Sequence, residues 1–233
     1  GNVLTRTSEA ITISVTPYNV SFPNLYFVGD ATTPGWNNNN NNTPVFRNQN
    51  VPNNYVYTGY FSAGAFKLLE VKGQWQPQWG TNDGSTLAVN PGGGSDPGTF
   101  NVSTAGYYTY NFTTVGEAGS FTVTPYDATT ATTYTTMAII GDGTPTGWGA
   151  DTFMTQDVNN PHLWYITGVT LTANQMKFRA NSDWGSNWGT SGSSELYGTG
   201  LFNAPNNISI PNAGVYDIWF NSLDARYILI PVL

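Results

Sequence analysis

The sequence predicts an all-β protein of two tandem immunoglobulin-like β-sandwich modules with almost no helix. Short runs of alternating apolar residues, such as 55–61 and 107–112, are separated by turn residues, a pattern typical of sandwich strands. No stretch sustains the apolar period of about 3.6 residues that a helix needs. Most of the stretch 137–188 also has a counterpart earlier in the chain, and a repeat of this length indicates two copies of one module.

Four anchors fix the alignment of the two repeats. Asp30 and Trp36, each preceded by Gly, are six residues apart, and the same spacing separates Asp142 from Trp148. The other anchors are a strand lysine (Lys67 and Lys177), a Trp-x3-Trp-Gly unit (75–80 and 184–189) and an Ala-Gly-x-Tyr sequence (105–108 and 213–216). Two copies of a module that carries tryptophan favour multivalent binding over catalysis.

The repeat predicts the domain boundaries. Residues 18–126 form the first module, 127–136 a Thr/Ala-rich linker and 137–233 the second module. Residues 1–17 are too few for a domain, and we interpret them as the last strand or a remnant of an upstream immunoglobulin-like domain. Because the linker is short, we expect the modules to sit close together in a semi-fixed orientation.

Composition and charge point to a neutral ligand. Only 9% of the 233 residues are charged, whereas aromatic residues reach 15%. The net charge of −7 argues against nucleic acid, which requires a basic surface. The same acidity disfavours anionic lipid and polyanionic glycans.

Metal, cofactor and catalytic chemistry find little support in the sequence. The chain has no cysteine, which excludes disulfides, zinc–thiolate sites and cysteine nucleophiles and favours a bacterial surface over a secreted eukaryotic setting. The single histidine, His162, follows a proline at a turn, where we expect it to be exposed. Asp30 and Asp142 are the only repeated carboxylates, and glycoside hydrolysis needs two across one bond. We therefore expect a non-enzyme without cofactor or metal, and no apolar run approaches the ~20 residues of a membrane helix.

Trp36 and Trp148 are the leading candidates for ligand contact. Each follows a Pro- and Gly-containing loop, where an indole is poorly placed for a core and well placed to offer a flat face. The C–H face of a sugar ring stacks on such a surface. The alternative is that these tryptophans cap the ends of the sandwiches.

The Trp-x3-Trp-Gly units provide a second set of indoles. A spacing of four would place both tryptophans of a unit on one side of an extended strand. One would close the edge of the core and the other would flank the ligand. We favour Trp79 and Trp188 over Trp75 and Trp184 as the more exposed members.

Lys67 and Lys177 lie in strands whose other face is apolar, so we expect their side chains to point away from the core. An ordinary solvated charge is the alternative reading. The three donors of an ammonium group suit vicinal hydroxyls of a neutral sugar. Arg179 shares the face of Lys177 but is replaced by Leu69 in the first repeat, which would make the two sites differ.

The segments VGDATTPGWN, IGDGTPTGW, MKFRANSDWGSNWG and NAGVYDIWF closely resemble the starch-binding modules of the SusE/SusF outer-membrane lipoproteins of Bacteroidetes. The resemblance implies tandem, non-catalytic carbohydrate-binding β-sandwiches. It also implies a cell-surface protein, lipid-anchored to the outer membrane through an upstream segment, that holds polysaccharide near a TonB-dependent SusC/SusD-like transporter complex.

The family's sites stack sugars on aromatic rings and bind hydroxyls through Lys or Arg and Asn. Carried onto matching positions, the resemblance implies Trp148, Lys177, Trp188 and Asn207 in the second repeat and Trp36, Lys67 and Trp79 in the first. The first repeat departs at the Asn position, where a longer Gly-rich loop carries Asp96. We therefore expect its site to be weaker or to select a different sugar geometry.

The resulting hypothesis is a surface protein with two weak sites for a neutral polysaccharide, starch-like α-glucan first, whose avidity comes from engaging one polymer twice. Another neutral polysaccharide, a structural or adhesive β-repeat protein and a glycoside hydrolase are the alternatives. The candidate ligand-binding residues are Trp36, Lys67, Trp75, Trp79 and Asp96 in the first module and Trp148, Lys177, Arg179, Trp184, Trp188 and Asn207 in the second.

Overall fold

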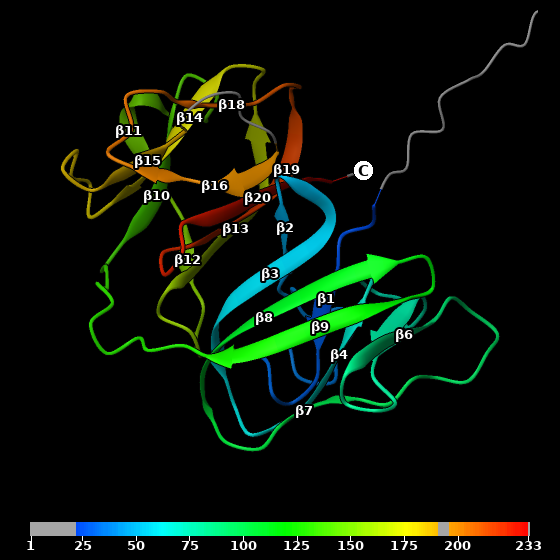
Figure 1. Ribbon diagram of the computed structural model, residues 1–233. Helices are drawn as coiled ribbons and strands as arrows, with labels where there is room; N and C mark the ends of the chain where they lie inside the picture. Colours follow the sequence, from blue (N-terminus) through cyan, green and yellow to red (C-terminus); the bar gives the residue numbers. More distant parts are fainter. Residues whose placement is uncertain (1–21, 191–195, 233) are drawn as a thin grey trace, which may run out of the picture.

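The computed structural model describes residues 22–190 and 196–232. All regular secondary structure within these ranges is β-strand, and they contain no helix. The prediction of an all-β protein is confirmed, and the arrangement of antiparallel sheets is that of β-sandwich modules (Figure 1). The immunoglobulin-like type of sandwich stays a prediction. The strand expected in residues 1–17 lies outside the described residues.

The first half of the chain forms one nine-stranded sheet in the order β1-β4-β5-β6-β9-β8-β3-β2, with β7 paired to β4. Backbone hydrogen bonds between Leu25 and Val45 and between Phe27 and Thr43 join β1 to the segment that leads into β2, so the sheet closes on itself. The strands are β1 Tyr26–Val28, β2 Phe46–Asn48, β3 Val51–Phe61, β4 Gly64–Leu69, β5 Gln78–Gly80, β6 Thr86–Asn90, β7 Phe100–Val102, β8 Gly106–Val115 and β9 Ala118–Pro125.

The second half forms two sheets, β11-β10-β14-β15-β17 with β18 on β14, and β12-β13-β19-β20-β16. Its strands are β10 Met137–Gly141, β11 Gly147–Phe153, β12 Thr155–Gln156, β13 Leu163–Leu171, β14 Gln175–Ala180, β15 Asn187–Gly189, β16 Tyr197–Thr199, β17 Leu201–Phe202, β18 Ile208–Ser209, β19 Gly214–Asn221 and β20 Arg226–Pro231.

The two halves share one pairing scheme. Strands β10, β14, β15, β13, β19 and β20 pair with one another as β1, β4, β5, β3, β8 and β9 do. The difference lies at β6, which pairs with both β5 and β9. Its counterpart is interrupted at Gly200, so β17 pairs with β15 while β16 pairs with β20, which is why the second half has two sheets.

At two of the repeated positions, 29/141 and 80/189, the backbone requires glycine. Gly29 and Gly141 have φ angles of +139° and +144°, a region that favours glycine. A Cβ atom at Gly80 or Gly189 would overlap a carbonyl oxygen of the loop that crosses the strand. Asp30 braces the same turn as Gly29, because its Oδ1 accepts a hydrogen bond of 2.8 Å from the Ala65 amide.

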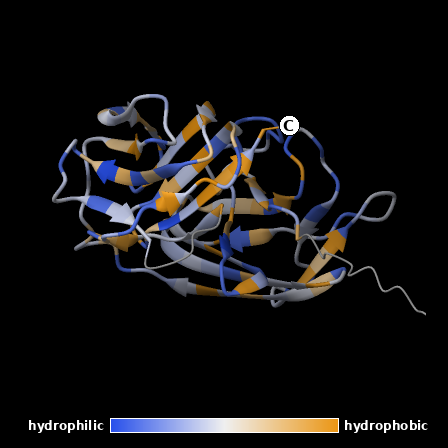
Figure 2. Ribbon diagram, turned by 90° about the horizontal axis from the view of Figure 1, so that it is seen from above, coloured by the Kyte–Doolittle hydropathy of each residue, from blue (hydrophilic) through white to orange (hydrophobic). Residues whose placement is uncertain are grey.

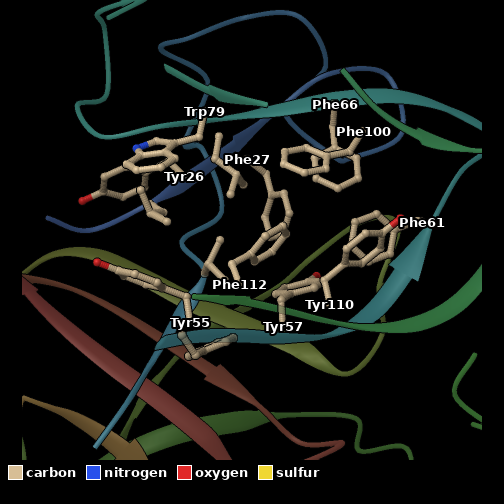
Figure 3. Close-up of a cluster of buried hydrophobic side chains, with 14 of the residues drawn as sticks. Tyr26, Phe27, Tyr55, Tyr57, Phe61, Phe66, Trp79, Phe100, Tyr110 and Phe112 are labelled. Atoms are coloured by element: carbon tan, nitrogen blue, oxygen red, sulfur yellow. The ribbon is translucent and has the colours of Figure 1, made fainter. Parts of the chain in front are cut away.

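Aromatic side chains fill the core of the first half (Figure 3). Phe66 stacks on Phe100 with ring centroids 4.9 Å apart, and Trp79 belongs to the same buried cluster. Hydrophobic residues alternate with hydrophilic ones along many strands (Figure 2), as expected when one face of each strand is buried. The second half has its own cluster, which includes Phe178 and Trp188.

The two halves pack against each other through buried polar and apolar contacts. Asn160 Nδ2 donates to the Tyr57 hydroxyl at 3.2 Å, and Asn221 Nδ2 donates to the Thr58 carbonyl at 2.6 Å. Lys72 forms an ion pair of 2.7 Å across the boundary with Asp217. The halves therefore have the close contact that the short linker led us to expect, while the boundaries at residues 126 and 136 stay predictions.

His162 corrects one expectation. It is only 3% exposed, because the turn that carries it lies against the first half rather than in solvent. Its Nδ1 lies 3.4 Å from Ser222 Oγ, and its ring meets the edge of Tyr107. Burial lowers the pKa of this imidazole.

Candidate functional site

A pair of indoles, Trp148 half-buried and Trp184 exposed, stands on the outer face of the second half. The ring centroids of Trp148 and Trp184 are 6.2 Å apart, with 38° between the ring planes. Trp148 follows the left-handed Gly147 at the start of β11, and the turn before it is closed by a 2.9 Å hydrogen bond from Thr144 Oγ1 to the Gly141 carbonyl. Trp184, on the turn between β14 and β15, is 49% exposed. Trp184 is thus open to solvent, and the half-buried Trp148 lies beside it at an angle.

A buried ion pair supports this platform. The Arg179 guanidinium lies 4.4 Å from the centre of the Trp184 ring, where a cation–π contact holds the indole. Arg179 Nη2 and Nε lie 2.8 and 2.9 Å from Asp151 Oδ1. Because both charged side chains are almost fully buried, the structure gives Arg179 a positioning role beneath Trp184.

Lys177 is buried, contrary to the expectation that it points into solvent. Its residue is 8% exposed, and its Nζ donates to Asn187 Oδ1 at 2.9 Å and to the Ala204 carbonyl. The side chain does leave the core, but the loop through Ala204 covers it. Burial lowers the pKa of its ammonium group, and two of its three donors already have protein acceptors.

The choice between the paired tryptophans was wrong. Trp79 and Trp188 are each 4% exposed, whereas Trp75 is 41% exposed. The spacing argument assumed one extended strand, but β15 spans only Asn187–Gly189 and Trp184 precedes it on a turn. Trp188 therefore faces the core beside Phe220, while Trp184 faces solvent.

Asn207 lies at the exposed end of the row of β14 side chains that includes Lys177 and Arg179. Its Nδ2 donates to Gln175 Oε1 at 2.9 Å. Asn207 is half-buried, and its role in binding stays a prediction.

The first half presents a more polar site. Trp36 and Trp75 are both exposed, but the described part of the chain shows no ring pair between them like that of the second half. Lys67 is half-buried, and its Nζ donates to Gln78 Oε1 at 2.7 Å. That is its one hydrogen-bond acceptor among the described residues, so two of its donors point to no protein acceptor there.

Asp96 belongs to this polar group. Its Oδ1 accepts hydrogen bonds from Asn90 Nδ2 at 2.7 Å and from Gln76 Nε2 at 3.3 Å. These bonds, with the charge of Lys67 nearby, hold the pKa of the Asp96 carboxyl below its ordinary value. The side chain is exposed and ionised at neutral pH, and it can accept hydrogen bonds from sugar hydroxyls.

Sequence reasoning missed the residues that support the two sites. Gln78 and Asn187, which bind the lysines, both stand immediately before the second tryptophan of the Trp-x3-Trp-Gly unit. The side-chain amide at the same position in both repeats was a sequence signal for the partner of the lysine. Asp151 has no such signal, because the first repeat has nothing equivalent to the Arg179–Asp151 pair.

The arrangement suits non-covalent binding. The exposed indoles, the half-buried Lys67 and the exposed Asp96 can make stacking and hydrogen-bond contacts. No group of three or more His, Cys, Asp or Glu residues within residues 22–190 and 196–232 could hold a metal ion. Within the same ranges, no helix is long and apolar enough to cross a membrane.

No protein-family profile matches the sequence, and no curated protein matches it. Among solved structures, the chain is similar to SusF from Bacteroides thetaiotaomicron, with 17% sequence identity and a TM-score of 0.34. The match covers 93% of this chain and 50% of SusF, so the chain spans about half the length of that protein.

Proposed function

We propose that the protein is a non-catalytic carbohydrate-binding protein that captures a neutral polysaccharide. The observation that carries the proposal is the surface pair of the half-buried Trp148 and the exposed Trp184, the latter held from beneath by Arg179. Indoles of this size are normally buried for their apolar area, so an exposed Trp184 beside a half-buried Trp148 on an acidic, polar surface favours a ligand with apolar ring faces and no charge.

The ring geometry favours a starch-like α-glucan among neutral polymers. The two indole planes are tilted by 38°, and successive sugar rings of a helical α-glucan are likewise tilted, whereas those of a flat, ribbon-like glucan are coplanar. Asn207 lies on the same face and could meet hydroxyl groups, whereas the buried amide of Asn187 is bonded to Lys177, Trp184 and Asn203.

Each site is expected to be weak. A few stacking and hydroxyl contacts offset little more than the cost of ordering a flexible chain. In the first half, Trp36, Trp75, Lys67 and Asp96 form the second candidate site, in which polar contacts outweigh stacking.

The setting follows from the sequence resemblance to SusE/SusF. It supports a lipid-anchored protein on the outer surface of a bacterial outer membrane, working in polysaccharide utilization beside a TonB-dependent SusC/SusD-like transporter.

Affinity gel electrophoresis against soluble α-glucan tests the function. Native protein should be retarded, and the double variant Trp148→Ala/Trp184→Ala should lose most of the retardation with little change in melting temperature. Val158→Ala, at another exposed apolar position, is the control. The proposal would be contradicted if the double variant were retarded as much as the control, or if no neutral glucan retarded the native protein. Either result would favour a structural β-repeat. Release of reducing sugar would reveal a hydrolase.

A further inference from the structure

The sheet of β13, β19 and β20 is buried on both faces. Leu163, Trp219 and Ile228 belong to the buried cluster of the first half, whereas their neighbours Trp164 and Phe220 belong to the cluster of the second half. Successive residues of a strand point to opposite faces, so one face of this sheet covers its own core and the other contacts the first half.

The candidate site of the second half lies on the far side of that module. In β14, Met176 and Phe178 face the core, and Lys177 and Arg179 face outward beneath Trp184. The outer face of the β14 sheet therefore points away from the first half.

The same holds in the first half. Its contacts to the second half come mainly from Arg47, Tyr57 and Thr58, on β2 and β3. Further contacts come from Thr33 and Lys72, in the loops that follow β1 and β4, and from Tyr107 at the start of β8. Lys67 lies on β4, in the part of the sheet across the core from β3, and its neighbours Phe66 and Leu68 face that core. Figure 1 shows β4 and β6 at one end of the molecule and β11, β14 and β15 at the other.

The contact between the halves fixes this arrangement. It combines the buried apolar residues named above with the Asn221–Thr58 hydrogen bond and the Lys72–Asp217 ion pair. A glucan bound at one site must travel around the body of the protein to reach the other.

We propose that the protein is a rigid two-headed cross-linker, which joins two separate neutral glycan chains rather than clamping one chain at both sites. This inference rests on the proposed function. Avidity on one chain requires that both sites be engaged together without bending the ligand around the protein. Two chains can occupy the opposed faces without such bending.

Two pools of soluble α-glucan, one carrying a donor and the other an acceptor fluorophore, provide the test. Native protein should raise energy transfer between the pools, and excess protein should abolish it, because each chain then carries its own protein molecules. Trp148→Ala/Trp184→Ala and Trp36→Ala/Trp75→Ala should each eliminate the signal at every concentration. Val115→Ala, at an exposed position of the β8–β9 turn, should behave like native protein.

Titration of the same proteins with a short α-glucan oligosaccharide, followed by tryptophan fluorescence, separates the two levels of the proposal. No response of native protein overturns both the glycan-binding function and the cross-linker. The cross-linker alone is overturned if both sites respond to the oligosaccharide, native protein causes no energy transfer, and native protein binds the polymer more tightly than either double variant does. Energy transfer that survives in either double variant also overturns it, since another assembly would then supply the second site.

Discussion

The two halves of this chain have the same frame and different surfaces. The turn that ends in Trp36 repeats the hydrogen bonds of the turn that ends in Trp148, with Thr32 and Thr144 each closing onto a glycine carbonyl. What faces solvent differs. The second half pairs its indoles and buries its lysine, whereas the first half leaves its indoles apart and its lysine partly free.

The comparison teaches that repeated residues need not be ligand-binding residues. Gly80 and Gly189 recur because a loop crosses the strand there, and Trp79 and Trp188 recur because they fill the two cores. The residues that would distinguish the ligands of the two sites, such as Arg179 with Asp151 and Asp96, are the ones that do not recur.

The largest expected effect is a difference in stability between substitutions of the buried and the exposed tryptophan of one Trp-x3-Trp unit. Trp188→Ala should lower the free energy of unfolding by about 3–5 kcal/mol, because it empties a buried aromatic site. Trp184→Ala should change it by no more than about 0.5 kcal/mol, as is usual for exposed positions. Urea denaturation of both variants measures this, and similar losses would show that Trp184 is also part of the core.

The next largest effect is expected from breaking the Arg179–Asp151 ion pair, which has no counterpart in the first half. Asp151→Ala leaves a buried guanidinium without its carboxylate and should destabilise the protein by about 3 kcal/mol. Because Arg179 then loses its fixed position under Trp184, binding of α-glucan should weaken as well. Denaturation and affinity electrophoresis measure the two effects; Asp183→Ala, an exposed aspartate on the same turn as Trp184, is the control. Unchanged binding in folded Asp151→Ala protein would refute the positioning role of Arg179.

Acid should weaken the contact between the halves through His162. Its pKa is lowered in the folded state, so the unfolded chain takes up a proton first as pH falls. Stability is then complete above the unfolded value of about 6.5 and declines below it as the pH approaches the lower folded value. The melting temperature should fall less between pH 7.5 and pH 5 in His162→Gln than in native protein. Parallel declines would mean that other groups control the acid response.

The sequence was sufficient for the all-β class and the repeat, because turn residues and alternation are local signals. It also placed Trp36 correctly on an exposed loop, whereas Trp148 lies half-buried at the start of β11. It could not show which tryptophan of each Trp-x3-Trp unit is buried, since that depends on where β5 and β15 begin. Nor could it show that a loop through Ala204 covers Lys177 or that His162 meets Tyr107, because those contacts join residues far apart in the chain.

The smallest effect compares the two lysines directly. Lys67→Ala should reduce glucan binding at the first site about fivefold, roughly 1 kcal/mol, because the ammonium keeps donors that a sugar hydroxyl can use. It should lower the melting temperature only slightly, because a single acceptor, Gln78 Oε1, loses its donor. Lys177→Ala should instead lower the melting temperature, because it leaves Asn187 Oδ1 and the Ala204 carbonyl without their donor. Each change is measured in protein whose other site carries the paired Trp→Ala substitutions, by oligosaccharide titration and thermal denaturation. If both lysines affected binding and stability alike, the difference in their burial would have no functional meaning, and the two sites would have to be treated as equivalent.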